Sequence, residues 1–250
     1  MKKELNSILI EKRAMYLAYD QGMEHGPIEF NENNVDPSYI IEIAKSGRYN
    51  GIIFQKGIAE KYNREIRKSK VPLIIKLNGK TNLYNGEPLS RQLCNVKEAI
   101  KLGASAVGYT IYLGSKYESI MLQEFEKIEE EAHKKRIPVI AWIYPRGKSV
   151  EHKDDGELMA YSARTALELG ADIVKIKYNG DIKDLKWAVK SAGKTRVVVA
   201  GGNKVKEKEF LREVSEVIKS GAMGVAVGRN VWQSKDPIEI SEKIRKIVFG

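Results

Sequence analysis

Short apolar runs recur along the chain, and stretches with helical periodicity separate most of them. The runs are four to five residues long and rich in Val and Ile, which is typical of strands buried on both faces of a parallel sheet. The predicted strands are Met15–Tyr19, Gly51–Phe54, Leu73–Leu77, Ala106–Thr110, Val139–Ile143, Ile173–Lys177, Arg196–Val199 and Gly224–Val227. The clearest predicted helices are Ser115–Lys135, Asp155–Leu169, Asp181–Ala192, Glu207–Ser220 and Pro237–Val248.

A glycine separates helix from strand in several of these units, as in Leu102-Gly103-Ala104, Leu169-Gly170-Ala171 and Ser220-Gly221-Ala222. Glycine just past a helix end supplies the left-handed residue that closes the last turn. Repeated helix–glycine–strand units indicate βα repeats and a parallel sheet. Eight such units in 250 residues predict an α/β fold, a single (β/α)₈ TIM-barrel domain over residues 1–250. A doubly wound open sheet is the alternative, but the dinucleotide fingerprint that it often carries is missing.

Composition narrows the range of partners. The net charge is +10, yet lysines alternate with acids along predicted helices, as in residues 124–136, which is typical of a solvated face with internal ion pairs. We therefore expect an anionic small molecule, and no nucleic acid, as the partner. Cys94 is the only cysteine, no apolar stretch approaches membrane-span length, and residues 1–4 do not open a signal peptide. These features predict a cytoplasmic protein without membrane contact.

One predicted strand contains a lysine. Lys175 lies within Ile173–Lys177, and alternation places it on the same face as Ile173 and Lys177. Burial of an ammonium group is costly unless the group is paired or loses its proton. A deprotonated lysine is a nucleophilic amine that forms Schiff bases with carbonyl compounds. Lys175 is therefore the leading candidate for catalysis, and a strand-end lysine with its head in water is the alternative.

Two glycine-containing loops follow the last two predicted strands. Their sequences are Ala200-Gly201-Gly202-Asn203-Lys204 and Val227-Gly228-Arg229-Asn230. In barrels, the loops after strands seven and eight often bind phosphate through backbone N–H groups and a short helix. Arg229 would add a charge-assisted contact, whereas glycines that only shape turns are the alternative. Phosphate binding at Ala200, Gly201, Gly202, Gly228 and Arg229 is the preferred interpretation.

Other polar residues follow the ends of earlier strands, where the site of a barrel lies. Tyr144 shares a face with Trp142 next to the strand of Lys175, and a tyrosine there could shuttle protons, whereas core or rim aromatics are the alternative. Arg146 suits a second phosphate or is a surface arginine. Asp20 could polarise a hydroxyl group or hold an ammonium group, and a turn or cap aspartate is the alternative. His25, in the loop after Asp20, is a candidate for phosphate contact or only a loop residue.

The chain has three histidines, at positions 25, 133 and 152, and no His/Cys/carboxylate cluster with zinc spacing. We therefore expect no metal and no other cofactor. Lys177 could lower the pKa of Lys175 by like-charge repulsion or could bind phosphate, and the sequence does not separate the two roles.

At these residues the chain resembles the archaeal-type class I fructose-bisphosphate aldolases, whose family also holds the 2-amino-3,7-dideoxy-D-threo-hept-6-ulosonate synthases. The resemblance runs from about Tyr16 to Gln233. The matching segments are AYDQGMEHGP (18–27), FQKGIAEKY (54–62), KLNGKTNLYNGEP (76–88), GASAVGYTIYLGS (103–115), YPRG (144–147), GADIVKIKYNGD (170–181), AGGNK (200–204) and GVAVGRNVWQ (224–233). One departure is Gln21, which stands where the family usually has histidine.

The resemblance implies a Schiff base on Lys175, a proton-transferring Tyr144 and a site carboxylate at Asp20. It also implies one substrate phosphate at the two glycine loops and the other near His25 and Arg146. Gln21 and Trp142 are further candidate substrate-binding residues. Similar enzymes are commonly homo-oligomers, often decamers, and serve glycolysis and gluconeogenesis.

The resulting hypothesis is a metal-independent lyase that reversibly cleaves fructose 1,6-bisphosphate, a phosphorylated sugar, to dihydroxyacetone phosphate and glyceraldehyde 3-phosphate. The nearest alternative is a related lysine-dependent transaldolase or heptulosonate synthase that uses another acceptor aldehyde. A sugar-phosphate-binding regulatory barrel without catalysis is the alternative from another class.

Overall fold

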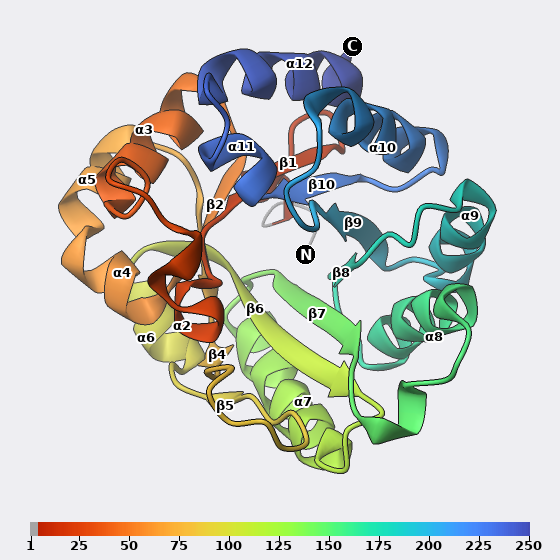
Figure 1. Ribbon diagram of the computed structural model, residues 1–250. Helices are drawn as coiled ribbons and strands as arrows, with labels where there is room; N and C mark the ends of the chain where they lie inside the picture. The colour runs from red at the N-terminus through yellow and green to blue at the C-terminus, as the bar shows by residue number, and fades with distance from the viewer. Residues whose placement is uncertain (1–4) are drawn as a thin grey trace.

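The computed structural model describes residues 5–250, in which eight parallel strands close into a barrel (Figure 1). The order around the ring is β1-β2-β3-β6-β7-β8-β9-β10 and back to β1. These strands are β1 Ala14–Ala18, β2 Gly51–Gln55, β3 Leu73–Lys76, β6 Ala104–Leu113, β7 Val139–Pro145, β8 Ile173–Ile176, β9 Arg196–Ala200 and β10 Gly224–Val227. Sequence order and spatial order agree around the whole ring, as expected for successive βα units.

Helices surround the barrel strands on the outside (Figure 1). The α-helices are α2 Gly22–His25, α3 Pro37–Ser46, α4 Lys56–Lys61, α5 Asn63–Ser69, α6 Val96–Lys101, α7 Glu118–Lys134, α8 Asp155–Glu168, α9 Ile182–Ser191, α10 Glu207–Lys219, α11 Arg229–Trp232 and α12 Pro237–Phe249. Three 3₁₀ turns, η1 Asn6–Ile8, η2 Pro27–Glu29 and η3 Lys148–Val150, and an antiparallel pair, β4 Asn78–Gly79 and β5 Arg91–Gln92, complete the description. The predicted TIM barrel is confirmed.

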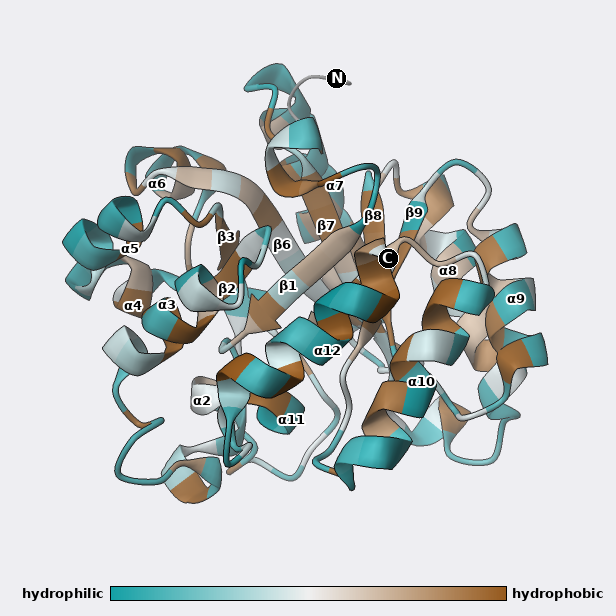
Figure 2. Cartoon of the chain, turned by 90° about the horizontal axis from the view of Figure 1, so that it is seen from above, coloured by the Kyte–Doolittle hydropathy of each residue, from teal (hydrophilic) through white to brown (hydrophobic). Residues whose placement is uncertain are grey.

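Alternation along the strands divides the core into two apolar clusters. Val174 and Ile176 belong to the large cluster between strands and helices, whereas Ile173 belongs to the smaller cluster inside the barrel. Lys175 therefore points into the barrel, as the period-two pattern predicts. The long helices carry bands of teal and brown along their length (Figure 2), because each buries an apolar stripe and leaves a polar face exposed.

The predicted helix–glycine–strand junctions form as expected. Gly170, which follows the last turn of α8, has φ of 77°, in the left-handed region that favours glycine. β8 begins at Ile173, three residues after Gly170. The five helices predicted from periodicity all form, with ends that differ from the prediction by at most three residues.

Some strands end at other residues than predicted. β6 and β7 pair from Val107 opposite Val139 to Leu113 opposite Pro145, so both extend beyond the predicted ends and Tyr144 lies within a strand. Lys177 was placed in a strand, but β8 ends at Ile176 and Lys177 begins the loop. The β4–β5 pair and the short helices α2 and α11 were not predicted, because they are too short for periodicity to indicate them.

Apolar side chains fill one end of the barrel. Ile8 of η1 and Leu5 belong to the interior cluster together with Ala14 and Met223, at the N-terminal ends of β1 and β10. This end is therefore sealed, and the polar interior residues gather at the opposite, C-terminal end. Among residues 5–250, no helix is both long and apolar enough to cross a membrane.

Candidate active site

A cavity of about 380 Å³ opens at the C-terminal ends of the strands. All of the candidate site residues proposed from the sequence line it: Asp20, Gln21, His25, Trp142, Tyr144, Arg146, Lys175, Lys177, Ala200, Gly201, Gly202, Gly228 and Arg229. The lining residues that the sequence reasoning missed are Ala18, Glu24, Lys76, Tyr178, Asn203, Glu213 and Ala226. Five lysines and arginines face three acidic side chains in this lining, so the cavity suits an anionic ligand.

Lys175 lines this cavity and is only 7% exposed. Its Nζ lies 5.2 Å from the centre of the Trp142 ring, and no ion pair within 4.0 Å involves it among residues 5–250. Burial, reinforced by the charge of Lys76, lowers the pKa of the Lys175 amine to about 8, although Asp20 and Glu24 oppose the shift. At pH 7 roughly a tenth of such amines are neutral, against fewer than about one in a thousand for an ordinary lysine.

The lowered pKa predicts the pH dependence of Lys175 reactivity. Neutral amine is the reactive form, so reductive methylation by formaldehyde with a mild hydride donor should rise as the pH passes through about 8. Ordinary lysines should reach half-maximal reactivity only near about pH 10.4. Peptide mass spectrometry of samples treated across this range measures both profiles. A Lys175 profile that coincides with that of the surface lysines would contradict the assignment.

Asp20 carries its negative charge beside two lysines. Its Oδ2 lies 3.3 Å from Nζ of Lys76, and the side chain is 8% exposed. Burial by itself would raise the pKa of the carboxyl group, but the charges of Lys76 and Lys175 outweigh burial and hold the pKa below its usual range. Asp20 is therefore an ionised acceptor at neutral pH, able to hold a proton donor or a hydroxyl group in the cavity.

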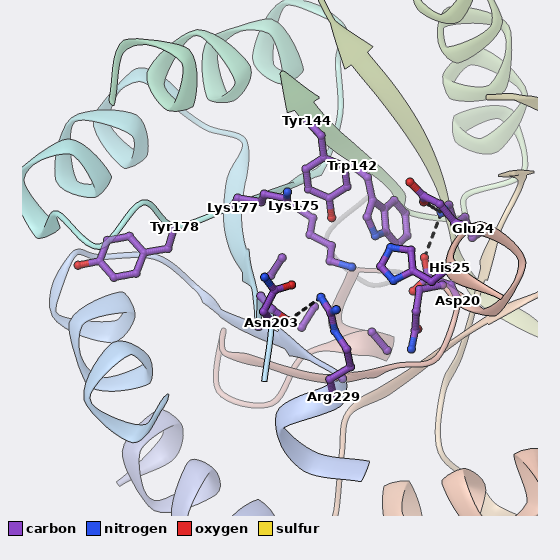
Figure 3. Close-up of a pocket in the computed structure, with 18 of the residues that line it drawn as sticks. Asp20, Glu24, His25, Trp142, Tyr144, Lys175, Lys177, Tyr178, Asn203 and Arg229 are labelled. Atoms are coloured by element: carbon purple, nitrogen blue, oxygen red, sulfur yellow. Dashed lines mark hydrogen bonds and ion pairs between the residues drawn. The ribbon is translucent and has the colours of Figure 1, made fainter. Parts of the chain in front are cut away.

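Tyr144 supplies the phenol of the site. Burial, together with the charges of Asp20 and Glu24, raises the pKa of Tyr144 well above its usual value. The group is therefore a protonated donor at neutral pH, and its conjugate phenolate would be a strong base. Figure 3 shows Tyr144, Trp142 and Lys175 pointing into the same space, whereas Tyr178 points away and its hydroxyl donates to Glu216 at 3.0 Å.

The indole of Trp142 fits because its neighbour on β6 has no side chain. A Cβ added to Gly108 would lie 1.2 Å from an indole carbon, so any other residue there would displace the ring. Nε1 of Trp142 and Nε2 of Gln21 are buried and have no acceptor among the described residues. An unpaired buried donor costs about 1–3 kcal/mol, so we expect these two groups to have a partner. Both residues line the cavity, where a ligand oxygen could accept from them.

Asn230 of α11 shapes the loop after β9. Its Nδ2 donates to the carbonyl oxygens of Gly201, at 2.7 Å, and Asn203, at 2.8 Å, while its Oδ1 accepts from the amide of Val205 at 3.0 Å. The amide of Gly201 donates to Ala226 O at 2.9 Å. The amide of Gly201 is therefore not free to bind a phosphate. A ligand at this loop would have to use backbone amides that follow Gly201.

Arg229 connects this loop to the loop after β1. Its Nη2 donates to Gly202 O at 3.0 Å, and its Nη1 pairs with Oε1 of Glu29. The other oxygen of Glu29 lies 3.0 Å from Nδ1 of His25. One carboxylate thus holds two side chains that were expected to contact different phosphates.

A second carboxylate holds the other arginine. Oε1 of Glu24 accepts from Nη1 of Arg146 at 2.7 Å and from the Tyr112 hydroxyl at 3.1 Å. Burial would raise the pKa of Glu24, but Lys76 and Arg146 outweigh it and hold the pKa low. Glu24 and Glu29 lie in one segment, so the loop after β1 orients both arginines of the cavity.

Lys76 is the missed residue that has the clearest signal in the sequence. It ends the apolar run Leu73-Ile74-Ile75, which is the same pattern that singled out Lys175. Lys76, rather than Lys177, is the lysine whose charge lowers the pKa of Lys175. Lys177 instead lies at the cavity mouth, with Nζ 5.8 Å from the Tyr144 ring centre.

The described part of the chain has no cluster of metal-ligating side chains. Within residues 5–250, no group of three or more His, Cys, Asp or Glu side chains could hold a metal ion. His133 lies outside the cavity lining, where its ring contacts Asp172 at 2.9 Å and Glu129 at 2.6 Å.

Comparison with known proteins places these features in context. The profile of the DeoC/LacD family aldolases matches residues 14–234. The chain is 51% identical over 241 residues to the fructose-bisphosphate aldolase class 1 of Thermoproteus tenax, covering 95% of this chain and 90% of that protein. It is 41% identical over 239 residues to the protein of the same name from Halobacterium salinarum, again covering 95% and 90%.

A solved archaeal fructose-1,6-bisphosphate aldolase has its catalytic lysine covalently bound to the carbinolamine intermediate of the substrate. The present chain superposes on it with a TM-score of 0.93 at 47% identity, and the alignment covers 99% of both chains.

Proposed function

The chain belongs to the DeoC/LacD aldolase family, and from this premise we propose that it is a class I aldolase, which reversibly cleaves fructose 1,6-bisphosphate to dihydroxyacetone phosphate and glyceraldehyde 3-phosphate. The observation that carries the proposal is the buried Lys175 amine, whose pKa is lowered to about 8. Tyr144 and Asp20 line the same cavity, and an arginine lies in each of the two expected phosphate regions. A buried amine beside a proton donor is what Schiff-base chemistry requires.

The reaction begins at the C2 carbonyl of the substrate. The neutral Lys175 amine adds to C2, and the proton that the nitrogen then loses passes to the carbonyl oxygen to give a neutral carbinolamine. Tyr144, a phenol with a raised pKa, donates the proton with which the carbinolamine hydroxyl leaves as water. The product is an iminium ion between Lys175 and C2.

In carbon–carbon cleavage Tyr144 acts as a base, whereas Lys175 stays bound to C2 as the iminium. The Tyr144 phenolate removes the proton of the C4 hydroxyl, and the C3–C4 bond breaks because the iminium accepts its electron pair. Glyceraldehyde 3-phosphate leaves, and the remaining enamine takes a proton at C3 from the Tyr144 phenol, which restores the iminium. Water then hydrolyses the iminium and releases dihydroxyacetone phosphate, while Asp20 orients the hydroxyl groups of the substrate or assists in proton transfer.

The two phosphates would bind in two different parts of the cavity. One is assigned to the loops that carry Gly201, Gly202, Gly228 and Arg229, and the other to His25 and Arg146. Both arginines have partners in the structure, Glu29 and Glu24, so a phosphate would bind beside an oriented guanidinium group. Gln21, Trp142, Lys177 and Ala200 complete the contacts with the substrate.

A coupled cleavage assay tests the proposal. We expect cleavage of fructose 1,6-bisphosphate that persists with a chelator, and a kcat/KM for fructose 1-phosphate that is roughly 10- to 100-fold lower, since one charged contact is lost. Absence of bisphosphate cleavage would contradict the proposal. If another acceptor aldehyde is preferred in the synthetic direction, the related transaldolase or heptulosonate synthase activity is favoured; binding of sugar phosphate without turnover would favour a regulatory barrel.

The compartment, the oligomeric state and the pathway of the enzyme are proposed as well. We propose a cytoplasmic homo-oligomer that acts in glycolysis or gluconeogenesis, without nucleic-acid or membrane partners. Exposed aromatic side chains on neighbouring helices, Tyr161 on α8 and Trp187 on α9, support an association surface, being 67% and 58% exposed. Light scattering of the purified protein measures the subunit number, and a monomer would refute this part.

A further inference from the structure

Two lysines are buried inside the barrel, and their surroundings are opposite. Lys175 on β8 is 7% exposed and has no ion pair among the described residues, whereas Lys76 on β3 is 4% exposed and lies between two carboxylates. Nζ of Lys76 is 3.3 Å from Oδ2 of Asp20 and 4.0 Å from Oε2 of Glu24. Both lysines line the same cavity. The barrel thus buries one ammonium group in an ion-pair network and one amine without a partner.

Asp20 is placed where it acts on both lysines. Its charge favours the ammonium form of Lys175, whereas the charge of Lys76 disfavours that form. A buried carboxylate interacts strongly with a nearby cation because the local dielectric is low. Without Lys76, Lys175 would become the main cation for Asp20 and would hold its proton up to a higher pH, so a smaller fraction of the amine would be neutral at pH 7. A protonated lysine cannot attack a carbonyl carbon.

We propose that Lys76 is a positioning residue that acts through Asp20: it occupies the carboxylate that would otherwise pair with Lys175, and so leaves the Lys175 amine free to react. Lys76 also lies 4.0 Å from Glu24, which in turn holds Arg146. Lys76 therefore contacts both Asp20, which lies near Lys175, and Glu24, which holds Arg146. The role of Lys76 in aldol cleavage rests on the proposed function. Its effect on the reactivity of the Lys175 amine does not.

The test compares Lys76→Met with Lys76→Arg by reductive methylation of Lys175, which needs no sugar substrate. In Lys76→Met the midpoint of Lys175 reactivity should rise by about one pH unit or more from its wild-type value near 8, while Lys76→Arg should stay close to wild type. A midpoint that stays unchanged or falls in Lys76→Met would overturn the proposal. So would an equal shift in both variants.

Removal of the carboxylate separates an electrostatic role from a structural one. Asp20→Asn should move the midpoint downward, because the group that favours the ammonium form is lost. The double variant Lys76→Met/Asp20→Asn should return toward the wild-type midpoint, since the two effects have opposite sign. If Lys76→Met does not fold, the Asp20→Asn arm still decides, and a rise there would refute the argument. Lys80→Met, which removes a lysine outside the cavity lining, is the matched control and should not move the midpoint.

Turnover gives a second readout. At pH 7, Lys76→Met should cleave fructose 1,6-bisphosphate about tenfold more slowly for each unit of upward shift, and activity should recover at about pH 9.5, where the amine is again neutral. A loss that is equal at all pH values would indicate a structural role and contradict the proposal. If no variant cleaves the sugar but the midpoints move as expected, the proposed function fails and the inference on Lys76 stands.

Discussion

Substitution of Lys175 by methionine is expected to abolish aldol cleavage without loss of stability. The variant lacks the nucleophile, so kcat/KM should fall by at least about 10⁴-fold, in line with removal of other enzymatic nucleophiles. The unfolded chain binds a proton on Lys175 up to about pH 10.4, but the folded chain binds it only up to about pH 8. Between these values the unfolded state binds more protons, so at neutral pH this buried lysine lowers stability.

Methionine fills similar space and removes that cost, so the thermal midpoint of Lys175→Met should equal or exceed that of the wild type. Borohydride treatment with dihydroxyacetone phosphate should leave a stable adduct on Lys175 of the wild-type protein and none on the variant. Lys177→Met is the matched control, because it removes a lysine at the mouth of the same cavity and should retain the adduct on Lys175. An adduct on another residue in the wild type would refute the assignment.

Removal of the Tyr144 hydroxyl should produce the second largest effect. Tyr144→Phe keeps the ring but loses the proton donor and acceptor, so kcat should fall by about 10²- to 10⁴-fold, the usual contribution of general acid–base catalysis. Both the dehydration of the carbinolamine and the C3–C4 cleavage would slow, whereas substrate binding should change little. Steady-state kinetics that separate kcat from KM measure the effect.

Tyr178→Phe is the control for this experiment. Tyr178 also lines the cavity, but its hydroxyl donates to Glu216 on α10 and points away from Lys175 (Figure 3). Its loss should change kcat by less than about threefold, since no proton transfer depends on it. Equal losses in the two variants, or full activity in Tyr144→Phe, would exclude Tyr144 as the proton-transferring group.

Local patterns predicted the barrel because each βα unit carries its own signals. The apolar runs, the helical periodicity and cap glycines such as Gly170 depend on neighbours within a few residues. Strand ends were predicted less accurately, since the ends of β6 and β7 depend on how long the two strands stay paired. That length is set by partners distant in the sequence.

The candidate residues could be found because a parallel barrel gathers the C-terminal ends of its strands at one end. Lys76 was nevertheless missed, although the run Leu73-Ile74-Ile75-Lys76 carries the same signal as the run around Lys175. A lysine in an apolar strand indicates an unusual environment, but not whether the environment supplies a counter-ion. Asp20 and Glu24, in the segment that follows β1, supply that counter-ion to Lys76.

The βα repeat, the inward direction of Lys175 and the set of strand ends that meet at the cavity could be predicted from the amino-acid order, because they follow from short-range periodicity. The pairing of charges could not, since it depends on the folded barrel: Asp20 lies beside Lys76, Glu24 beside Arg146 and Glu29 beside Arg229. Proton affinity depends on burial and on charges a few ångströms away, and both are properties of the closed barrel. A lysine becomes a nucleophile or a counter-ion only when its neighbours in space are set.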